Sequence, residues 1–453
     1  MRRDAWELFP DCAGAMCAAL SALDVCGAAR VSRAWQAASR TVLDHRHAQL
    51  RDAVATATVV ASSGVDGESD IESGLLLMIH KIGWVPQVCI VFATEESDAL
   101  RDGELARAAA ARLAPGCLVV GASGERVIGP EAPGGAGVEL GCDGVAVLLL
   151  RCGGGARPPA LLALPARPRA PTRPSQLAGR GFTCAGGTAA VDSDAGLRAA
   201  VARAHGARPF ADAGALCAAF VERWVDALGA GSAAAGGARK PHQTHVTFFR
   251  DADCAQACLG ADARGHPGLG SGHCGSVVGG LASATEELFA GRASAVAAAA
   301  CVVLTFFDSP TEHFAARCVS VADGQGAGYG PLCQRELAAQ RVQTTASRVS
   351  ASIRAADAAP LAPAFGLTIT CIARDVRFHG GGVNVEASAH TSLLGPIPLI
   401  GFFANGEIGP CKPDAAWSDS AQGDEDSDDG DAPAQYALHG YTTCLALFGS
   451  TRG

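Results

Sequence analysis

Residues 88–94 (VCIVFAT) decide the fold class of this sequence, because an uncharged run rich in β-branched and aromatic side chains favours a buried strand. Similar runs stand at 56–62 (TATVVAS), 117–121 (CLVVG) and 144–150 (GVAVLLL). The segments between them, 69–82 and 97–113, are predicted to be helical. Strands that alternate with helices in this way predict a mixed sheet with helices packed on it.

A second α/β stretch is predicted from residue 244 onward. Its strands are expected at 244–249, 276–282, 302–307, 314–321, 366–372, 397–403 and 441–448. Helices are expected at 190–228, 334–355 and 385–394. The apolar segment 295–307 is predicted to begin as a core helix and to run into a strand.

Two segments interrupt this pattern. Residues 153–176 are rich in Gly, Pro and Arg, which predicts a linker or an exposed loop. Residues 414–431 are packed with Asp, Ser and Gly, and they are interpreted as a solvated, disordered insertion rather than a metal site.

Composition excludes several classes of protein. Hydrophobic residues make up 49% of the 453 residues, which supplies enough apolar surface for large cores and excludes a mainly disordered chain. No apolar run reaches the roughly 18 residues of a membrane helix. The net charge of −9 argues against broad nucleic-acid binding.

The 18 cysteines are scattered through the sequence, many of them inside apolar runs. The N-terminus begins MRRDAW without an apolar segment behind it, so a secretory signal is not expected. The cysteines are therefore interpreted as reduced, buried small hydrophobes, and the protein is expected in the cytoplasm, the nucleus or both.

The first fifty residues carry a recognisable motif. Residues 8–11 (LFPD) precede a helical pattern that ends in Val31-Ser32-Arg33-Ala34-Trp35. This series resembles an F-box, whose last element is Val-[Cys/Ser]-Arg-x-Trp. The resemblance implies that residues 5–50 dock a spare apolar edge into a groove on a Skp-type cullin adaptor. The implied anchors are Pro10, Leu20, Leu23, Val25, Val31 and Trp35. The alternative is an ordinary helical cap on the next domain.

The last quarter of the chain carries a second motif. Residues 401–409 read GFFANGEIG after an apolar strand, residues 384–387 read NVEA, and residues 441–443 read YTT. This series resembles the C-terminal half of a FIST domain, a family named for F-box and intracellular signal transduction proteins. The two resemblances together predict an α+β fold: a small N-terminal three-helix F-box, then a large mixed α/β FIST body of β-sheets with flanking helices. The expected regions are 5–50, 55–340 and 341–453.

The residues around the second motif indicate a polar site at the end of a strand. Asn405-Gly406 is a turn signal, and it places Glu407 at the edge of an α/β sheet, where ligand sites gather. By the resemblance, this region forms a sensing or substrate-recruiting pocket. The polar candidates are Arg374, Asn384, Glu386, Asn405, Gly406 and Glu407. The alternative is that the glycines serve a turn and Glu407 only caps neighbouring amides.

Other motifs are weaker. Gly270, Gly272 and Gly275 match a dinucleotide-binding spacing, but no strand precedes them. Cys254 and Cys258, followed by His266, His273 and Cys274, are too loosely spaced for a zinc knuckle. No phosphate loop is present, and no cofactor or catalytic metal is predicted.

The leading hypothesis is therefore a non-catalytic substrate receptor of a Skp–cullin–F-box ubiquitin ligase, which recruits a protein target for proteasomal degradation through its FIST body. Catalysis would come from proximity to a charged ubiquitin carrier. The second hypothesis is a FIST-type sensor of a small ligand. The third is an enzyme that uses Glu407.

Overall fold

A computed structural model of the chain describes about half of its residues. The described residues are 38–39, 54–62, 79, 82, 84–94, 113–130, 137–141, 144–152, 157–165, 183–185, 194–205, 210, 212–233, 243–260, 269, 276–282, 288–307, 314–322, 362–376, 379, 381–394, 397–410, 436–440 and 442–450. The six predicted adaptor contacts, Pro10, Leu20, Leu23, Val25, Val31 and Trp35, lie outside them.

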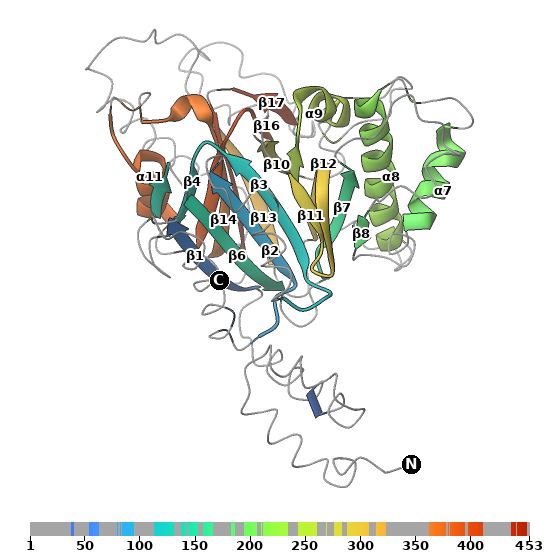
Figure 1. Ribbon diagram of the computed structural model, residues 1–453, viewed down its shortest axis with the longest axis horizontal. Helices are drawn as coiled ribbons and strands as arrows, with labels where there is room; N and C mark the ends of the chain where they lie inside the picture. The colour runs from blue at the N-terminus through green and yellow to red at the C-terminus, as the bar shows by residue number, and fades with distance from the viewer. Residues whose placement is uncertain are drawn as a thin grey trace, which may run out of the picture.

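The described residues form a mostly β structure, with 53% in strands and 26% in helices (Figure 1). The four α-helices whose bounds are described lie between residues 194 and 394, and a few further helical residues are described at 38–39 and 79. The predicted α+β class is therefore wrong for the described residues, and the predicted three-helix F-box at 5–50 lies outside them except for residues 38–39. Part of the physical reason is that alanine-rich segments pair as strands, so that tertiary context overrides the helix propensity of alanine.

The larger of two sheets has twelve strands. Its main path runs β1 (Val54–Ser62), β6 (Gly144–Cys152), β2 (Val88–Thr94), β3 (Leu118–Gly124), β11 (Phe289–Arg292), β12 (Ala295–Phe307), β9 (Gln243–Phe249), β10 (Ser276–Leu281), β16 (Glu407–Pro410) and β17 (Tyr436–His439). In addition, β7 (Ala160–Pro165) pairs with β12, and β8 (Thr183–Ala185) pairs with β7. The pairs β2–β3 and β9–β10 are parallel, and the other pairs are antiparallel.

The smaller sheet has six strands and combines distant parts of the chain. Its order is β13 (Phe314–Ala322), β18 (Thr442–Ser450), β14 (Ala362–Cys371), β15 (Leu399–Ala404), β4 (Val127–Pro130) and β5 (Gly137–Leu140). Strands β14 and β15 are parallel, as expected for strands joined by a crossover helix. The last two strands come from the N-terminal half of the chain, so the two predicted α/β regions share one sheet.

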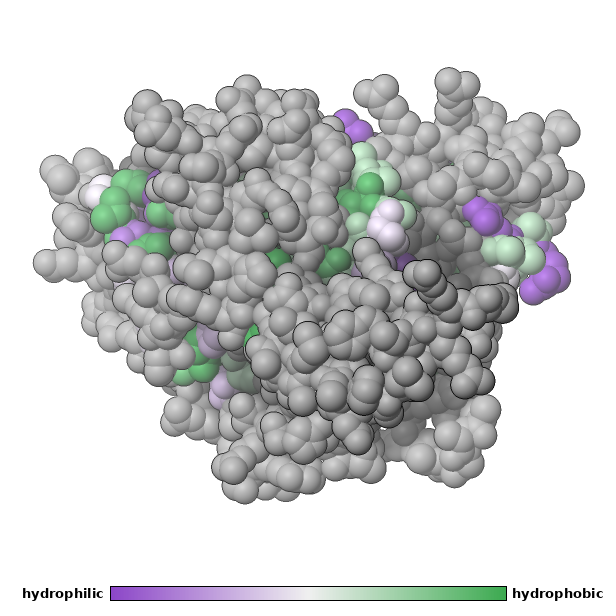
Figure 2. Space-filling view, turned by 60° about the horizontal axis from the view of Figure 1, so that its bottom comes forward, coloured by the Kyte–Doolittle hydropathy of each residue, from purple (hydrophilic) through white to green (hydrophobic). Residues whose placement is uncertain are grey.

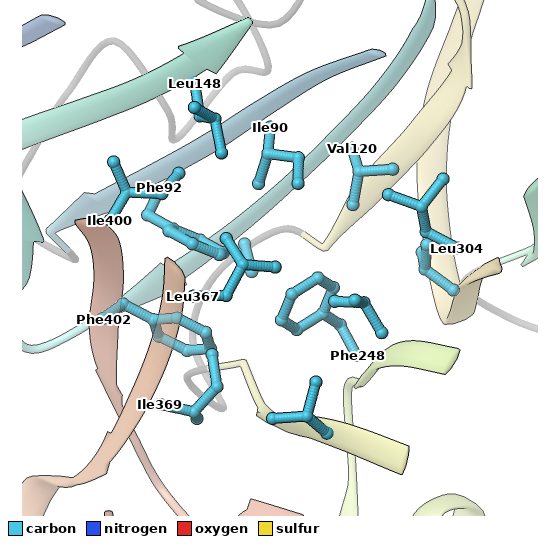
Figure 3. Packing of buried hydrophobic residues seen from close by; sticks show 14 of the residues in the cluster. Ile90, Phe92, Val120, Leu148, Phe248, Leu304, Leu367, Ile369, Ile400 and Phe402 are labelled. Carbon is cyan, nitrogen blue, oxygen red and sulfur yellow. The ribbon is translucent and has the colours of Figure 1, made fainter. Parts of the chain in front are cut away.

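The main core lies between the two sheets (Figure 3). The strands contribute alternate residues to it: Ile90 and Phe92 from β2, Ile400 and Phe402 from β15. The ring centroids of Phe92 and Phe402 are 4.9 Å apart, and Phe248 of β9 lies 5.9 Å from Phe402. Because aromatic side chains bury large apolar areas, this contact across the sheets stabilises the sandwich.

Helices cover the outer faces of both sheets. On the larger sheet, α7 (Asp194–His205), α8 (Ala213–Ala233) and α9 (Ala252–Leu259) lie together at one end of the molecule (Figure 1). Trp224 and Phe220 of α8 are fully buried in the same core cluster as Val303 of β12. On the smaller sheet, α11 (Val385–Leu394) covers the face opposite the main core. No helix among the described residues is long and apolar enough to cross a membrane.

Most predicted strands are present, and three predictions need correction. The predicted linker at 153–176 contains β7, whose Leu161 and Leu162 are fully buried, because the apolar run ALLALP pairs with β12. Residues 295–307 form one strand of 13 residues rather than a helix followed by a strand. The helix predicted at 190–228 is two helices, α7 and α8. The predicted helices at 69–82, 97–113 and 334–355 fall largely or wholly outside the described residues.

Candidate functional site

The polar residues of the last quarter gather around a β–α–β unit. Strand β14 runs into a 3₁₀ turn, Ile372–Arg374, and α11 then leads back to β15, which pairs in parallel with β14. Both strands therefore end at the same edge of the sheet, at Cys371 and Ala404. Such carboxyl ends are where α/β sheets bind ligands.

Arg374 and Glu386 form a fully buried ion pair at this edge. The Nε and Nη2 atoms of Arg374 both lie 2.7 Å from Oε1 of Glu386, and neither side chain is exposed. Burial alone raises the pKa of Glu386, but Arg374 above all, with help from His379 and His390, holds this pKa well below its usual range. Glu386 is therefore an ionised carboxylate in the interior.

Two histidines flank the same carboxylate. Nε2 of His379 lies 3.2 Å from Oε1 of Glu386, and Nε2 of His390 lies 3.8 Å from Oε2. Burial lowers the pKa of His390, and Arg374 lowers it further, against the opposing effect of Glu386. His390 is 2% exposed, and neither of its ring nitrogens has a hydrogen-bond partner among the described residues. Buried polar atoms of this kind are normally satisfied, so the two ring nitrogens are candidate hydrogen-bonding groups for a ligand.

The sheet contributes two threonines beneath α11. Thr443 of β18 places its Oγ1 atom 3.3 Å from Oε2 of Glu386 and 3.4 Å from Oγ1 of Thr370 on β14. Both threonines are fully buried. Their hydroxyl groups give the outer face of the sheet a polar patch directly below the ion pair.

Glu139 of β5 fixes the start of α11. Its Oε1 atom accepts hydrogen bonds from the backbone N–H groups of Glu386, at 2.8 Å, and Ala387, at 3.2 Å. These groups lie in the first helical turn, where backbone N–H groups lack partners within the helix. Burial raises the pKa of Glu139, the hydrogen bond from Ala387 lowers it, and nearby Glu386 raises it. The carboxyl group therefore holds Glu386 in place from 247 residues away in sequence.

Asn384 joins the same two elements. It has a left-handed backbone with φ of 57°, and its Oδ1 atom accepts a 2.8 Å hydrogen bond from the backbone N–H of Glu139. Asparagine tolerates this backbone region better than most residues. Asn384 thus positions the helix start rather than lining the ion pair.

Replacing Asn384 with alanine is expected to lower the free energy of unfolding by about 1–3 kcal/mol, because it removes an acceptor and leaves an unfavoured backbone. Asn384→Gly loses the same acceptor but relieves the backbone, so its cost should be smaller. Urea unfolding measures both. A glycine variant as unstable as the alanine variant would contradict the role assigned to the backbone.

Glu407 lies where the chain passes from one sheet to the other. After β15, the exposed Asn405 and the buried Gly406, which has a φ of 135°, turn the chain into β16 of the larger sheet. Oε2 of the fully buried Glu407 accepts hydrogen bonds from Oγ1 of Thr442 at 2.7 Å and from its backbone N–H at 3.3 Å. Oε1 has no hydrogen-bond partner among the described residues.

Burial raises the pKa of Glu407 to about 7, although Thr442, the thiol of Cys371 and the charge of Arg374 all favour the carboxylate. Glu386 and Glu407 thus sit near one guanidinium with pKa values shifted in opposite directions. Two carboxyl groups in such different protonation states can accept and donate hydrogen bonds within one site.

The raised pKa of Glu407 makes stability depend on pH. Because the pKa of Glu407 is about 7 in the folded chain and 4.5 as a free side chain, its burial lowers the stability of the fold progressively as pH rises from 4.5 to about 7, and the loss levels off above that. The advantage of Glu407→Gln over the parent should therefore grow between pH 5 and pH 8, by about 1–3 kcal/mol.

Urea unfolding of both proteins at pH 5, 6.5 and 8 measures this effect. The surface variant Asp226→Asn is the control, since Asp226 pairs with Arg223 at an exposed position. Parallel stability curves for the parent and Glu407→Gln would contradict the burial of a titrating carboxyl group at this position.

The structure brings together only some of the predicted site residues. Arg374 and Glu386 are in direct contact, and Glu407 is close enough to Arg374 for its pKa to respond. Asn384 lies at the helix start, and Asn405 is exposed. Gly406 serves the turn, and its backbone carbonyl accepts a 2.9 Å hydrogen bond from Leu281. Sequence reasoning missed His379, His390, Glu139, Thr370, Thr442 and Thr443 as site residues.

The two histidines and Glu386 suggest a metal site at first sight. However, no group of three or more His, Cys, Asp or Glu side chains within the described ranges is arranged to hold a metal ion. The guanidinium of Arg374 already forms an ion pair with the Glu386 carboxylate at 2.7 Å. Its positive charge disfavours the binding of a metal cation at the same carboxylate.

Comparisons with known proteins agree with part of the second motif. The chain is 39% identical over 95 residues to an uncharacterized protein of Mycobacterium tuberculosis, and 38% identical over 95 residues to an uncharacterized protein of Mycobacterium bovis. Each match covers 21% of this chain and 19% of the relative, so the chain spans about a fifth of the length of the curated relatives it matches. None of these matches points to an F-box. Residues 334–410 match the FIST C domain family, so the chain contains a FIST C domain, and Arg374, Glu386 and Glu407 lie within it.

Proposed function

We propose that this chain is a binding module that senses a small polar molecule at the cluster formed by Arg374, Glu386, His390 and Glu407. The observation that carries the proposal is a pair of buried polar groups without hydrogen-bond partners among the described residues: both ring nitrogens of His390 and Oε1 of Glu407. The pKa values of both side chains respond to the charge of Arg374, so the two groups share one environment.

The free groups define the chemistry of the ligand. A carboxylate oxygen accepts hydrogen bonds only, and a neutral imidazole offers one acceptor and one donor. Two carboxyl groups, Glu386 and Glu407, respond to the charge of Arg374, so the carboxyl groups outnumber this guanidinium. This environment favours a small molecule with an N–H donor group, such as an amine or an amide. Binding of a cationic amine would favour the ionised form of Glu407.

Thermal unfolding of the full chain with primary amines and primary amides at millimolar concentration tests the proposal. A compound that binds the folded state raises the melting temperature in proportion to its saturation. The shift should be absent in Glu407→Gln and in His390→Phe and should persist in the surface control Asp226→Asn. No shift with any compound, or an equal shift in Glu407→Gln, would refute the proposal.

The role as a ubiquitin-ligase receptor stays a prediction of the sequence. It rests on the motif Val31–Trp35 and on residues outside the described part of the chain. A pull-down with a Skp-type adaptor tests it, with Leu23→Ala/Trp35→Ala as the variant expected to lose binding. Equal capture of parent and double variant would refute the F-box interpretation.

A further inference from the structure

Arg157 lies at the end of the larger sheet, just before β7 begins. Pro158 and Pro159 follow it, and a proline restricts the residue before it to an extended backbone. The guanidinium Cζ atom of Arg157 lies over the ring of Phe307, 3.7 Å from the ring centroid. Phe307 is the last residue of β12 and belongs to the core cluster on the outer face of the sheet, under α8. A cation–π contact this short holds the guanidinium in place.

The charge of this guanidinium has no described counter-charge. Nη2 of Arg157 is buried and has no hydrogen-bond partner among the described residues. Burial lowers the pKa of Arg157, and no carboxylate within the described ranges counters this effect. A partly buried cation without a counter-charge is unfavourable, because it loses hydration and gains no ion pair. Arg157 as a whole stays partly exposed, so a small solute can reach it from solvent.

A second unsatisfied group lies beside the same ring. Gln243 is the first residue of β9, and it lies in register with Phe307 of β12. Because directly paired residues of antiparallel strands point to the same face, the Gln243 side chain and the Phe307 ring are neighbours. Gln243 is only 6% exposed, and its Oε1 atom is buried without a hydrogen-bond partner in the described part of the chain. Groups of this kind are normally satisfied.

The polar groups further along this face are already paired. Nδ1 of His245 lies 3.0 Å from Oγ1 of Thr305, and Nε1 of Trp224 on α8 donates a 3.4 Å hydrogen bond to the same oxygen. All three side chains are fully buried. The unsatisfied groups therefore lie at the ends of the strands, where β9 and β7 begin and β12 ends.

We propose that Arg157 and Gln243 form a binding site for a small oxyanion, which is a carboxylate or a phosphate group. A guanidinium that lies over an aromatic ring keeps N–H donors at its edge, and these donors match the oxygens of such an anion. The side-chain amide of Gln243 offers a further N–H donor. A bound oxyanion supplies the counter-charge for Arg157 and an acceptor for its buried Nη2. This site does not depend on the proposed sensor cluster around Arg374, which lies on the smaller sheet.

Thermal unfolding of the full chain in sodium acetate, sodium phosphate and sodium chloride, at one pH and one ionic strength, tests the proposal. Chloride controls for charge screening. Because phosphate also stabilises proteins without a specific site, the measured quantity is the rise in melting temperature of the parent minus that of Arg157→Gln. We expect an excess of about 2 °C at an anion concentration ten times the dissociation constant. An excess in acetate alone indicates a carboxylate ligand, and an excess in phosphate alone indicates a phosphate ligand.

Two further variants and a control sharpen this test. Arg157→Lys keeps the charge but loses the planar donor fork, so it should lose most of the excess. Gln243→Glu places a permanent carboxylate beside Arg157, so it should raise the melting temperature in chloride and abolish the response to acetate and phosphate. The control is Arg292→Gln, since Arg292 is exposed at the end of β11, and this variant should respond as the parent does.

Equal melting temperatures of the folded parent in all three salts would overturn the proposal, and this result does not depend on whether any variant folds. An equal response in the parent and Arg157→Gln, or in the parent and Gln243→Glu, would overturn it as well.

Discussion

Replacing Glu386 with alanine is expected to lower the free energy of unfolding by about 3–5 kcal/mol, one of the largest effects of any single substitution in this chain. The substitution leaves the guanidinium of Arg374 buried without its carboxylate partner, 2.7 Å away in the parent. It also removes the acceptor that faces Thr443, His379 and His390. Urea unfolding monitored by circular dichroism measures the loss.

A double variant separates the unpaired charge from the loss of packing. Glu386→Leu combined with Arg374→Met removes both charges, and we expect it to recover much of the stability that Glu386→Ala loses. The exposed pair of Arg223 and Asp226, at 3.3 Å, provides the matched control, because Asp226→Asn should change stability by less than about 1 kcal/mol. A double variant as unstable as Glu386→Ala would show that charge burial is not the cause.

Replacing Gly401 with alanine is expected to destabilise the protein by about 4 kcal/mol or more, which in practice means loss of soluble, folded protein. Gly401 of β15 lies in register with Thr368 of β14, and an added Cβ would overlap the backbone carbonyl of Thr368. A backbone atom within a paired strand cannot move aside as a flexible side chain can. Soluble yield and circular dichroism measure the effect.

Gly116 is the matched control for this substitution. It is exposed, and a Cβ added there meets no atom within 4 Å. Gly116→Ala should therefore yield as much folded protein as the parent. If Gly401→Ala also unfolds at the parent's denaturant midpoint, the strand register assigned to β14 and β15 is wrong.

Hydrophobic runs were sufficient to predict most of the core strands. The segment 88–94 forms β2 over the predicted range, and 385–394 forms α11. The failures have local causes. Proline and arginine around residues 160–165 suggested a linker, although ALLALP is apolar enough to pair. Alanines at 297–300 suggested a helix, but this segment pairs in the sheet with β11 and β7, and these pairings override the helix propensity of alanine.

The candidate site was only partly predictable. Arg374, Glu386 and Glu407 could be selected because they stand beside a family motif. His390 carried a usable signal, since it lies four residues after Glu386 on one helix and therefore on the same face. Glu139 carried none, because only the folded sheet brings β5 to the start of α11. The predicted adaptor-binding residues lie outside the described part of the chain.

Strands β4 and β5 belong to the smaller sheet, and this has a practical consequence for anyone who wishes to isolate the FIST C domain. A fragment that starts at residue 334 would lack both strands and also β13, and it would therefore expose the backbones of β15 and β18 as open edges. The same cut would remove the Glu139 carboxyl group that satisfies the first turn of α11. We therefore expect that the region matched by sequence does not fold on its own, and expression trials should retain residues 127–140 and 314–322.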